Sequence, residues 1–141
     1  MLPILKLSVA ALIPVVATLI FLHKDVDKKI SSMNYWVGQI IYGVVFGMIA
    51  ILGTEWGIKM NGYFVNCRDA APMIAGLLFG GPAGIIAGFI GGLERWLAVY
   101  WGAGEFTRIA CTLSTCVAGF YAAFLRKYFF DTIYMVLWCY L

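Results

Sequence analysis

Long apolar blocks alternate with short polar links along the 141-residue chain. Apolar runs of about 18 residues or more predict membrane spans, and blocks near 1–22, 35–54, 70–99 and 106–125 reach or approach that length. The pattern predicts helices over about 3–22, 34–54, 70–80, 82–99 and 105–125. Another apolar run begins at Phe129 and reaches Leu141, which is shorter than the roughly 20 residues that a span needs. We therefore expect an all-α polytopic membrane protein with about six transmembrane or half-membrane helices in the lipid bilayer.

Two turn signals interrupt the apolar pattern. Asn61-Gly62 stands between two short runs, which predicts a short β-hairpin near 57–66. Gly80-Gly81-Pro82 joins a helix-ending glycine to a helix-starting proline, which predicts a helical hairpin at this position. Asp69 is a candidate N-cap for the helix that leads into that turn.

Basic residues indicate how the chain crosses the membrane. Cytoplasmic loops carry an excess of lysine and arginine, and the basic residues of two links are Lys24, Lys28, Lys29, Arg126 and Lys127. If both links are cytoplasmic, the N-terminus lies outside and an even number of crossings connects the links. That number requires the chain to turn back at Gly80-Gly81-Pro82.

Composition and charge exclude several function classes. Hydrophobic residues make up 63% of the chain and charged residues 12%, well below the roughly 25% charged residues of soluble domains. The net charge of +3 lies mainly in the two basic links, so it indicates orientation rather than nucleic-acid binding. The cysteines and the single histidine have no metal-ligand spacing, and no nucleophile–base pair is visible. We expect no metal, no cofactor and no enzymatic activity in this segment.

Two arginines stand out within the apolar sequence, each beside an acid. In a hairpin, Arg68 and Arg95 would each lie about 18–20 Å from the turn and reach the same depth near the outer face. In one continuous helix they would lie about 40 Å apart, at opposite surfaces. Charges inside a membrane are costly unless paired. Either Asp69 and Glu94 neutralise the arginines, or the two guanidinium groups bind an anion such as a carboxylate or phosphate.

The helix over 105–125 supplies further candidates. Cys111 and Ser114 are three residues apart and share one face. They either orient a small polar ligand or form a small-residue packing stripe with Ala118 and Ala122. A second series of small residues, four apart, predicts close helix packing: Gly84, Gly88 and Gly92.

The segments NCR, AGLLFGGPAGIIAGFIGGLERW and CTLST together resemble the membrane sensor module of the LytS/YhcK-type receptors, the five-transmembrane receptor family. The likeness covers about residues 35–130. It implies an N-terminal sensory module that is joined, in the whole receptor, to a cytoplasmic histidine kinase or diguanylate cyclase. On this basis we expect 1–141 to be a single membrane-embedded sensor domain, truncated in its last helices and without its output domain.

The resemblance also implies a ligand and the residues that bind it. Pyruvate-sensing members of the family use two arginines and a Cys-x-x-Ser pair, so the implied residues are Asn66, Arg68, Arg95, Cys111 and Ser114. Asn66 would organise the first arginine, the ligand would be a small pyruvate-like carboxylate, and the receptor would be a homodimer. Two features depart from the family pattern. Glu94 precedes the second arginine, and the loop after Arg95 contains Glu105 and Arg108, which would change the expected ligand choice.

Two alternatives remain open. The Gly-Pro-x-x-Gly-x-x-x-Gly helix is distantly similar to the membrane-embedded substrate-binding subunits of vitamin transporters, which predicts a small-molecule transporter subunit with ATPase partners. A purely structural membrane protein is the third interpretation. It predicts that replacement of Arg68 or Arg95 changes folding without changing any ligand response.

Overall fold

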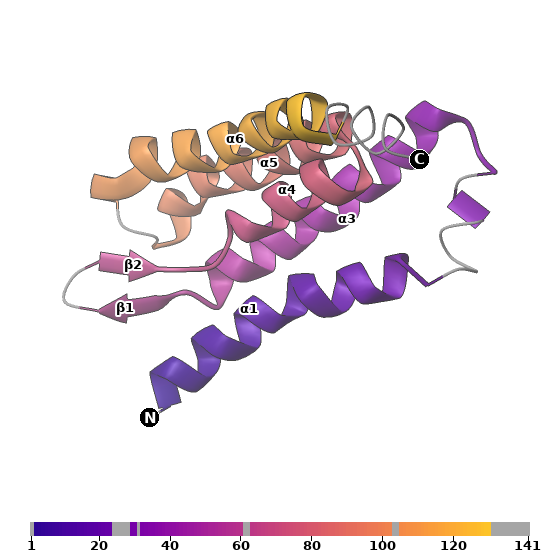
Figure 1. Ribbon diagram of the computed structural model, residues 1–141. Coiled ribbons are helices and arrows are strands. Elements are labelled where there is room, and N and C mark those ends of the chain that lie inside the picture. The colour runs from indigo at the N-terminus through magenta and orange to yellow at the C-terminus, as the bar shows by residue number, and fades with distance from the viewer. Residues whose placement is uncertain (1, 24–28, 31, 61–62, 103–104, 131–141) are drawn as a thin grey trace.

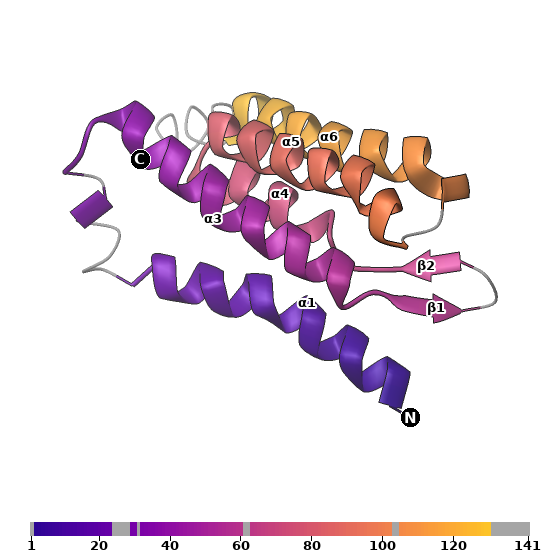
Figure 2. The same cartoon turned by 180° about the vertical axis from the view of Figure 1, so that it is seen from behind.

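A computed structural model describes residues 2–23, 29–30, 32–60, 63–102 and 105–130 of the chain. Among these residues, four helices are long and apolar enough to cross a membrane. Figure 1 shows how the helices are arranged from one side and Figure 2 from behind. They are α1 (Leu2–Phe21), α3 (Tyr35–Glu55), α5 (Gly81–Leu97) and α6 (Arg108–Leu125). Short helical turns continue α5 and flank α6: η2 (Ala98–Trp101), η3 (Glu105–Thr107) and η4 (Arg126–Phe130).

The nearly all-helical membrane architecture expected from the sequence is confirmed, but the expected count of about six helices is not. A shorter apolar helical segment consists of α4 (Ala70–Ile74) and the π-helical turn η1 (Ala75–Phe79). Ten residues of helix extend about 15 Å, about half of the hydrocarbon thickness of a bilayer. The apolar run from Phe129 to Leu141 lies mostly outside the described residues, which end at 130.

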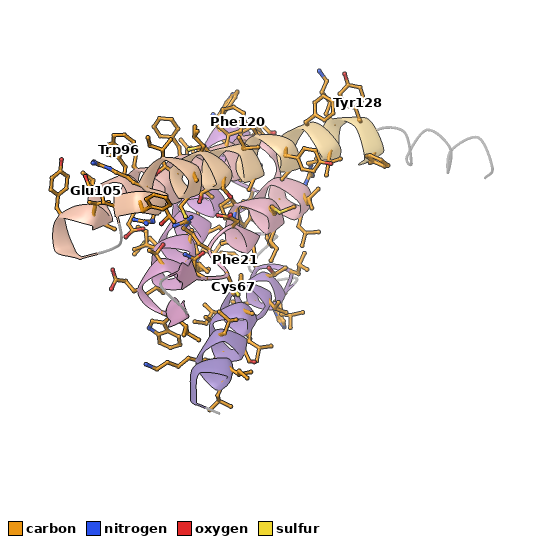
Figure 3. All side chains as sticks on the ribbon, turned by 90° about the vertical axis from the view of Figure 1, so that its left-hand side faces the viewer. Phe21, Cys67, Trp96, Glu105, Phe120 and Tyr128 are labelled. Atoms are coloured by element: carbon orange, nitrogen blue, oxygen red, sulfur yellow. The ribbon has the colours of Figure 1, made fainter. Side chains whose placement is uncertain are left out.

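Large apolar side chains cover the outside of the helices. Phe89 of α5 is 56% exposed, and Leu113 and Phe120 of α6 are 58% and 54% exposed. Figure 3 shows Phe120 at the outer surface of α6. Soluble monomers rarely expose continuous apolar surface of this kind. The surface therefore suits lipid contact, in agreement with the spans predicted from the sequence.

The chain reverses direction at Gly80, where the sequence places a turn. Gly80 has φ 153° and ψ 149°, a conformation that residues with a Cβ rarely adopt. Its amide donates to the carbonyl oxygen of Ala75 at 3.1 Å, which closes the π-helical turn. Beyond the break, Gly84 packs against Gly76, and a Cβ added to Gly84 would lie 2.5 Å from the Gly76 Cα. Residues that precede α4 and residues that end α5 therefore lie at the same end of the bundle.

Gln39 of α3 holds this turn, although it lies 40 residues away in sequence. Its side-chain Nε2 donates to the Phe79 carbonyl at 3.0 Å, and its Oε1 accepts from the Ala83 amide at 3.1 Å. Both backbone groups belong to the helix ends that the break leaves without intrahelical partners. Gln39 is only 5% exposed, so its amide gives these two backbone groups hydrogen-bond partners from within the protein.

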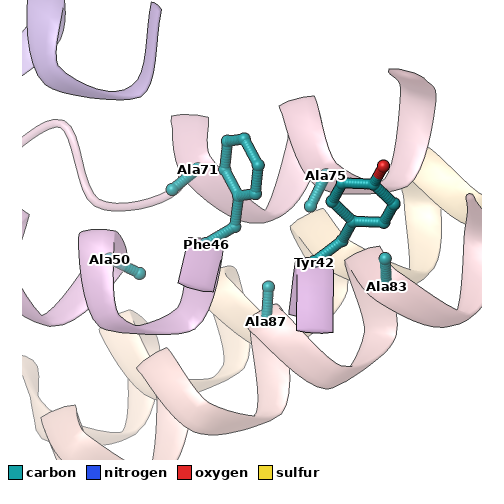
Figure 4. Close-up of a cluster of buried hydrophobic side chains, with 7 residues drawn as sticks. All are labelled: Tyr42, Phe46, Ala50, Ala71, Ala75, Ala83 and Ala87. Atoms are coloured by element: carbon teal, nitrogen blue, oxygen red, sulfur yellow. The ribbon is translucent and has the colours of Figure 1, made fainter. Parts of the chain in front are cut away.

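The core is built from two aromatic side chains and many small ones. Tyr42 and Phe46 of α3 pack against alanines of α3, α4, η1 and α5 (Figure 4). The Tyr42 ring also stacks on Phe79 with the centroids 4.5 Å apart. The alanines of this cluster are Ala50, Ala71, Ala75, Ala83 and Ala87. Small side chains let the reversed segment lie close to α3.

Glycines also bring α5 and α6 together, as the sequence predicts. A Cβ added to Gly88 would lie 2.9 Å from the Thr115 carbonyl oxygen, and one added to Gly92 would lie 2.6 Å from the Cys116 Sγ. The buried face of α6, however, differs from the stripe expected from the sequence. It consists of Thr115, Gly119 and Ala122, of which only Ala122 belongs to the expected set.

Two short strands lie between α3 and α4. Strand β1 (Ile58–Met60) pairs antiparallel with β2 (Tyr63–Val65), within the range where the sequence predicts a β-hairpin. The register places Ile58 opposite Val65 and Met60 opposite Tyr63. The turn residues expected to join them, Asn61 and Gly62, lie outside the described residues. In Figure 1 these strands extend beyond the same end of the bundle as the N-terminus.

Candidate functional site

Arg68 lies immediately after the strands and before α4, and it is almost completely buried, with 2% of its surface exposed. Its backbone fits closely against Gly53 of α3, where an added Cβ would lie 3.2 Å from the Arg68 Cα. The side chain then passes Gly91 of α5, where an added Cβ would lie 4.0 Å from the Arg68 Cδ. Glycines on two helices therefore make room for a long charged side chain inside the bundle.

The Arg68 guanidinium reaches α6. Its Nε donates to the Thr115 hydroxyl at 2.7 Å, and its Nη2 donates to the Cys111 carbonyl at 3.0 Å. The third nitrogen, Nη1, is buried and has no hydrogen-bond partner among the residues that the structure describes. A buried donor without a partner costs about 1–3 kcal/mol, and more when it is charged. Arg68 therefore retains unused capacity to bind an acceptor.

Asp69 adds a carboxylate to the same group of atoms. Its Oδ1 accepts from the Thr115 hydroxyl at 2.6 Å and lies 3.4 Å from the Arg68 Nε, while its Oδ2 accepts from Ser114 at 2.5 Å. Asp69 occupies the N-cap position of α4 but makes no side-chain capping bond there. The predicted cap is therefore wrong, because this carboxylate binds the hydroxyls of α6 instead of the amides of its own helix.

Arg95 reaches the beginning of α6 from the last turn of α5. It is 2% exposed, and its Nη2 donates to the Thr107 hydroxyl at 3.0 Å. Thr107 precedes the Cys111 and Thr115 contacts of Arg68 by four and eight residues, which is about 6–12 Å along a helix. The two guanidinium groups thus lie at the same end of the bundle. Arg68 binds α6 one to two turns further from the start of that helix than Arg95 does.

Glu94 supplies the second acid of the site. Its carboxylate lies within electrostatic range of both Arg68 and Arg95, and Thr54 of α3 lies within hydrogen-bonding reach. Its Oε2 is buried without a hydrogen-bond partner in the described part of the chain. The hypothesis that Asp69 and Glu94 neutralise the arginines is thus partly supported, since both acids face them. Neither acid, however, contacts the Arg68 Nη1 through a hydrogen bond within the described ranges.

Arg108 forms an aromatic contact at the outer margin of this cluster. Its guanidinium carbon lies 4.0 Å from the centroid of the Trp96 ring and 5.4 Å from that of Tyr100. Such cation–π contacts stabilise by about 0.5–1 kcal/mol when exposed and more when desolvated. Arg108 supplies the cation for both rings. It ties the start of α6 to the end of α5, directly beside the bond between Arg95 and Thr107.

The structure brings together four of the five predicted ligand residues in one region and assigns them unequal contacts. Arg68 and Arg95 are buried as expected, and Ser114 contributes its hydroxyl. Cys111 contributes its backbone carbonyl, while its thiol is free. Asn66 is half-buried two residues before Arg68. The hydrogen bonds described for the Arg68 guanidinium go to Thr115 and Cys111 and do not involve Asn66.

Two functional side chains were not identified from the sequence. The Thr115 hydroxyl accepts from the Arg68 Nε, and the Thr107 hydroxyl accepts from Arg95. The bonds of Asp69 to two hydroxyls of α6 were also not expected. Thr115 is fully buried at 0% exposure and lies four residues before Gly119 on the packed face of α6. The four-residue spacing of Thr115 and Gly119 could have placed both residues on one packed helix face. A hydroxyl on a buried helix face requires a polar partner, so this spacing could have identified Thr115 as a site residue.

A cavity of about 270 Å³ lies at the opposite end of the bundle, beside the Gly80 turn. It borders the Gln39 side chain and the Phe79 ring, so it is separate from the arginines. The lining residues are Ile30, Met33, Tyr35, Gly38, Gln39, Tyr42 and Phe79.

Spanning helices that enclose two buried arginines define a multi-pass membrane module with a polar interior. The family model described as 5TMR of 5TMR-LYT matches residues 26–140, and the chain belongs to this family of five-transmembrane receptors. The resemblance drawn from the sequence is therefore confirmed. The five-transmembrane module is a sensing region rather than a catalytic one, and its bearers are multi-pass proteins of the bacterial inner membrane.

Two relatives from Escherichia coli strain K12 are sensor histidine kinases. The chain is 37% identical to sensor histidine kinase YpdA over 75 residues and 33% identical to sensor histidine kinase BtsS over 76 residues. These matches cover 53% and 54% of this chain but only 13% of each relative. No solved structure matches the chain. The chain is thus a membrane sensing module of a signal-transduction receptor, and it spans a small part of the relatives it matches.

Proposed function

We propose that this module binds a small carboxylate, such as pyruvate, from the outer side of the membrane. Arg68 and Arg95 would bind the carboxylate, and the polar groups of α6 would contact the rest of the molecule. The observation that carries the proposal is the Arg68 guanidinium, which is 2% exposed and has an unpartnered Nη1 among the described residues.

Energetics favour a ligand with negative charge. Arginine inside a membrane protein is costly unless it is paired, and such residues mark ligand or ion sites by default. The planar guanidinium fork matches the two oxygens of a carboxylate, and charged hydrogen bonds are about twice as strong as neutral ones. An acceptor at the Arg68 Nη1 would satisfy a donor that the described protein groups leave unused.

The direction of entry follows from the distribution of basic residues. Lys29 precedes α3, and Arg126 and Lys127 follow α6, so all three lie at the same end as the Gly80 turn. The Arg126 Nη1 donates to the Leu77 carbonyl at 2.8 Å, three residues before that turn. By the rule that positive ends face the cytoplasm, the arginine site and the N-terminus lie on the outer side.

The similarity to sensor histidine kinases suggests how ligand binding would be signalled. We propose that the module acts in a homodimer and passes its state to a cytoplasmic domain, as the name sensor histidine kinase indicates for the relatives. A ligand shifts such a receptor only if it binds two conformations with different affinity. The similarity to sensor kinases favours this role over the alternative of a transporter subunit.

A thermal-shift screen tests the proposal. Purified protein in detergent is heated with sodium pyruvate, acetate or chloride, and the same series is run on Arg95→Ala and on Lys127→Ala. Lys127 is exposed at the far end of α6, so its replacement removes one positive charge without touching the site. Pyruvate should stabilise the wild type and Lys127→Ala but not Arg95→Ala. Stabilisation that survives in Arg95→Ala, or that is absent from the wild type, would refute the proposed site.

A further inference from the structure

The charges of the site are balanced before any ligand arrives. Arg68, Arg95 and, at the margin, Arg108 supply three positive charges. Asp69, Glu94 and, beside Glu94, Glu55 supply three negative charges. A bound monoanion would add one negative charge to a buried, formally neutral cluster. Desolvated charge without compensation is strongly unfavourable. If the proposed function holds, displacement of Asp69 or Glu94 would restore the balance when a carboxylate binds.

Asp69 and Glu94 differ in how easily they can move. The Asp69 side chain is 38% exposed, so its carboxylate has a path to water. It also precedes α4 rather than lying within a long helix. Glu94 belongs to the last turns of α5, and its Oε2 is buried. The geometry thus makes Asp69 the acid that can leave.

The donors that Asp69 uses are the ones that a carboxylate ligand would need. Its two oxygens accept from Ser114 at 2.5 Å and Thr115 at 2.6 Å, and one oxygen lies 3.4 Å from the Arg68 Nε. Asp69 thus presents to α6 the same chemical group that the ligand carries. The Ser114 and Thr115 hydroxyls each have one proton, and the Thr115 hydroxyl also lies 2.9 Å from the Cys111 carbonyl oxygen. Neither hydroxyl can therefore donate to Asp69 and to a ligand simultaneously.

We propose that Asp69 is an internal competitor that occupies the carboxylate position of the site and that the ligand displaces. The Asp69 carboxylate also joins the start of α4 to the middle of α6. Its displacement exchanges a bond between two segments of the protein for bonds between α6 and the ligand. The ligand thereby changes how α4 and α6 are held together, which supplies the difference between two receptor states.

Replacement of Asp69 by asparagine tests this role. Asp69→Asn keeps the shape of the side chain but removes the charge that competes for Arg68. The dissociation constant for sodium pyruvate is measured by calorimetry on purified wild-type chain, on Asp69→Asn and on Lys127→Gln. Lys127 is exposed in η4 at the other end of the bundle, so its variant controls for a general change of one unit of charge.

Asp69→Asn should bind pyruvate about tenfold more tightly than the wild type. Loss of one competing hydrogen bond to a charged group is expected to change the dissociation constant by at least about tenfold. Lys127→Gln should change the constant less than about twofold, as expected for a screened and distant surface charge. Equal or weaker binding by Asp69→Asn, while the wild type binds, overturns the competitor role and leaves the proposed function intact. Absence of binding in both proteins overturns the proposed function as well.

A measurement on the wild type is independent of how the variant folds. Aspartate labelled with ¹³C at its carboxylate is introduced, and infrared difference spectra are recorded as sodium pyruvate is added. The aspartate carboxylate stretch should shift as Asp69 exchanges two hydroxyl donors for water. An unchanged aspartate band at saturating pyruvate, with binding verified by calorimetry, contradicts displacement.

Discussion

Replacement of Gln39 by leucine tests the turn on which the arginine site depends. Leucine keeps an apolar side chain of similar size but removes the bonds to the Phe79 carbonyl and the Ala83 amide, which measure 3.0 and 3.1 Å. Polar contacts inside membrane proteins contribute about 0.6 kcal/mol on average and about 1.7 kcal/mol at most. Loss of two such contacts should therefore lower the free energy of unfolding by about 1–3 kcal/mol.

The assay is reversible unfolding in mixed micelles with increasing denaturing detergent, with Ser8→Ala as the control. The Ser8 hydroxyl donates only within its own helix, to the Ile4 carbonyl at 3.0 Å, so its loss should change stability by less than about 0.5 kcal/mol. Hydrogen exchange at the Ala83 amide should also accelerate about tenfold in Gln39→Leu. Stability and exchange equal to those of the wild type would refute the idea that Gln39 holds the turn.

Two further predictions concern helix contacts. Gly84→Val should destabilise the protein by about 1–3 kcal/mol in the same unfolding assay, because an added Cβ would lie 2.5 Å from the Gly76 Cα and the reversed segments would have to separate; unchanged stability would contradict the close packing at the turn. Arg108→Met should lower stability by about 0.5–1 kcal/mol through loss of the contact with Trp96, whose ring centroid lies 4.0 Å from the guanidinium carbon. The change should disappear when Trp96→Leu is already present, and equal losses in both backgrounds would refute the contact.

Helix positions followed closely from the apolar pattern. The sequence predicts a helix over about 34–54, and the structure has it at Tyr35–Glu55. The Gly80 break was also visible, because only glycine tolerates the backbone conformation found there. Such features are local, since they depend on hydrophobic length and on the backbone freedom of single residues.

Contacts between segments that are distant in the sequence could not be predicted from the apolar pattern. Gln39 lies 40 residues from Phe79, and nothing in its neighbourhood indicates that it completes the turn. Helical spacing identified a polar face near Cys111 and Ser114 but could not establish the rotation of α6. The structure turns Thr115 inward toward Arg68 at 2.7 Å. Rotation and depth depend on how glycines and alanines of separate helices fit together, which one helix alone does not reveal.

The role of Asp69 shows the same limit in electrostatic terms. An acid beside an arginine suggested neutralisation, and a position before a helix suggested a cap. The structure satisfies the carboxylate with Ser114 and Thr115, more than 40 residues away. Hydroxyls from another helix are stronger partners here because α4 is only five residues long and Pro72 lacks an amide in its first turn.

Solid-state nuclear magnetic resonance measures the proposed contact itself. Pyruvate labelled with ¹³C at its carboxylate is bound to protein in lipid bilayers, with ¹⁵N in the guanidinium groups of its arginines. A carboxylate that accepts from these groups places its carbon about 4 Å from the guanidinium nitrogens. We predict dipolar dephasing at that distance in the wild type and its loss when Arg68 and Arg95 are both replaced by lysine. Absence of dephasing for bound pyruvate, or dephasing unchanged in the double variant, would contradict a carboxylate site built on the two buried arginines.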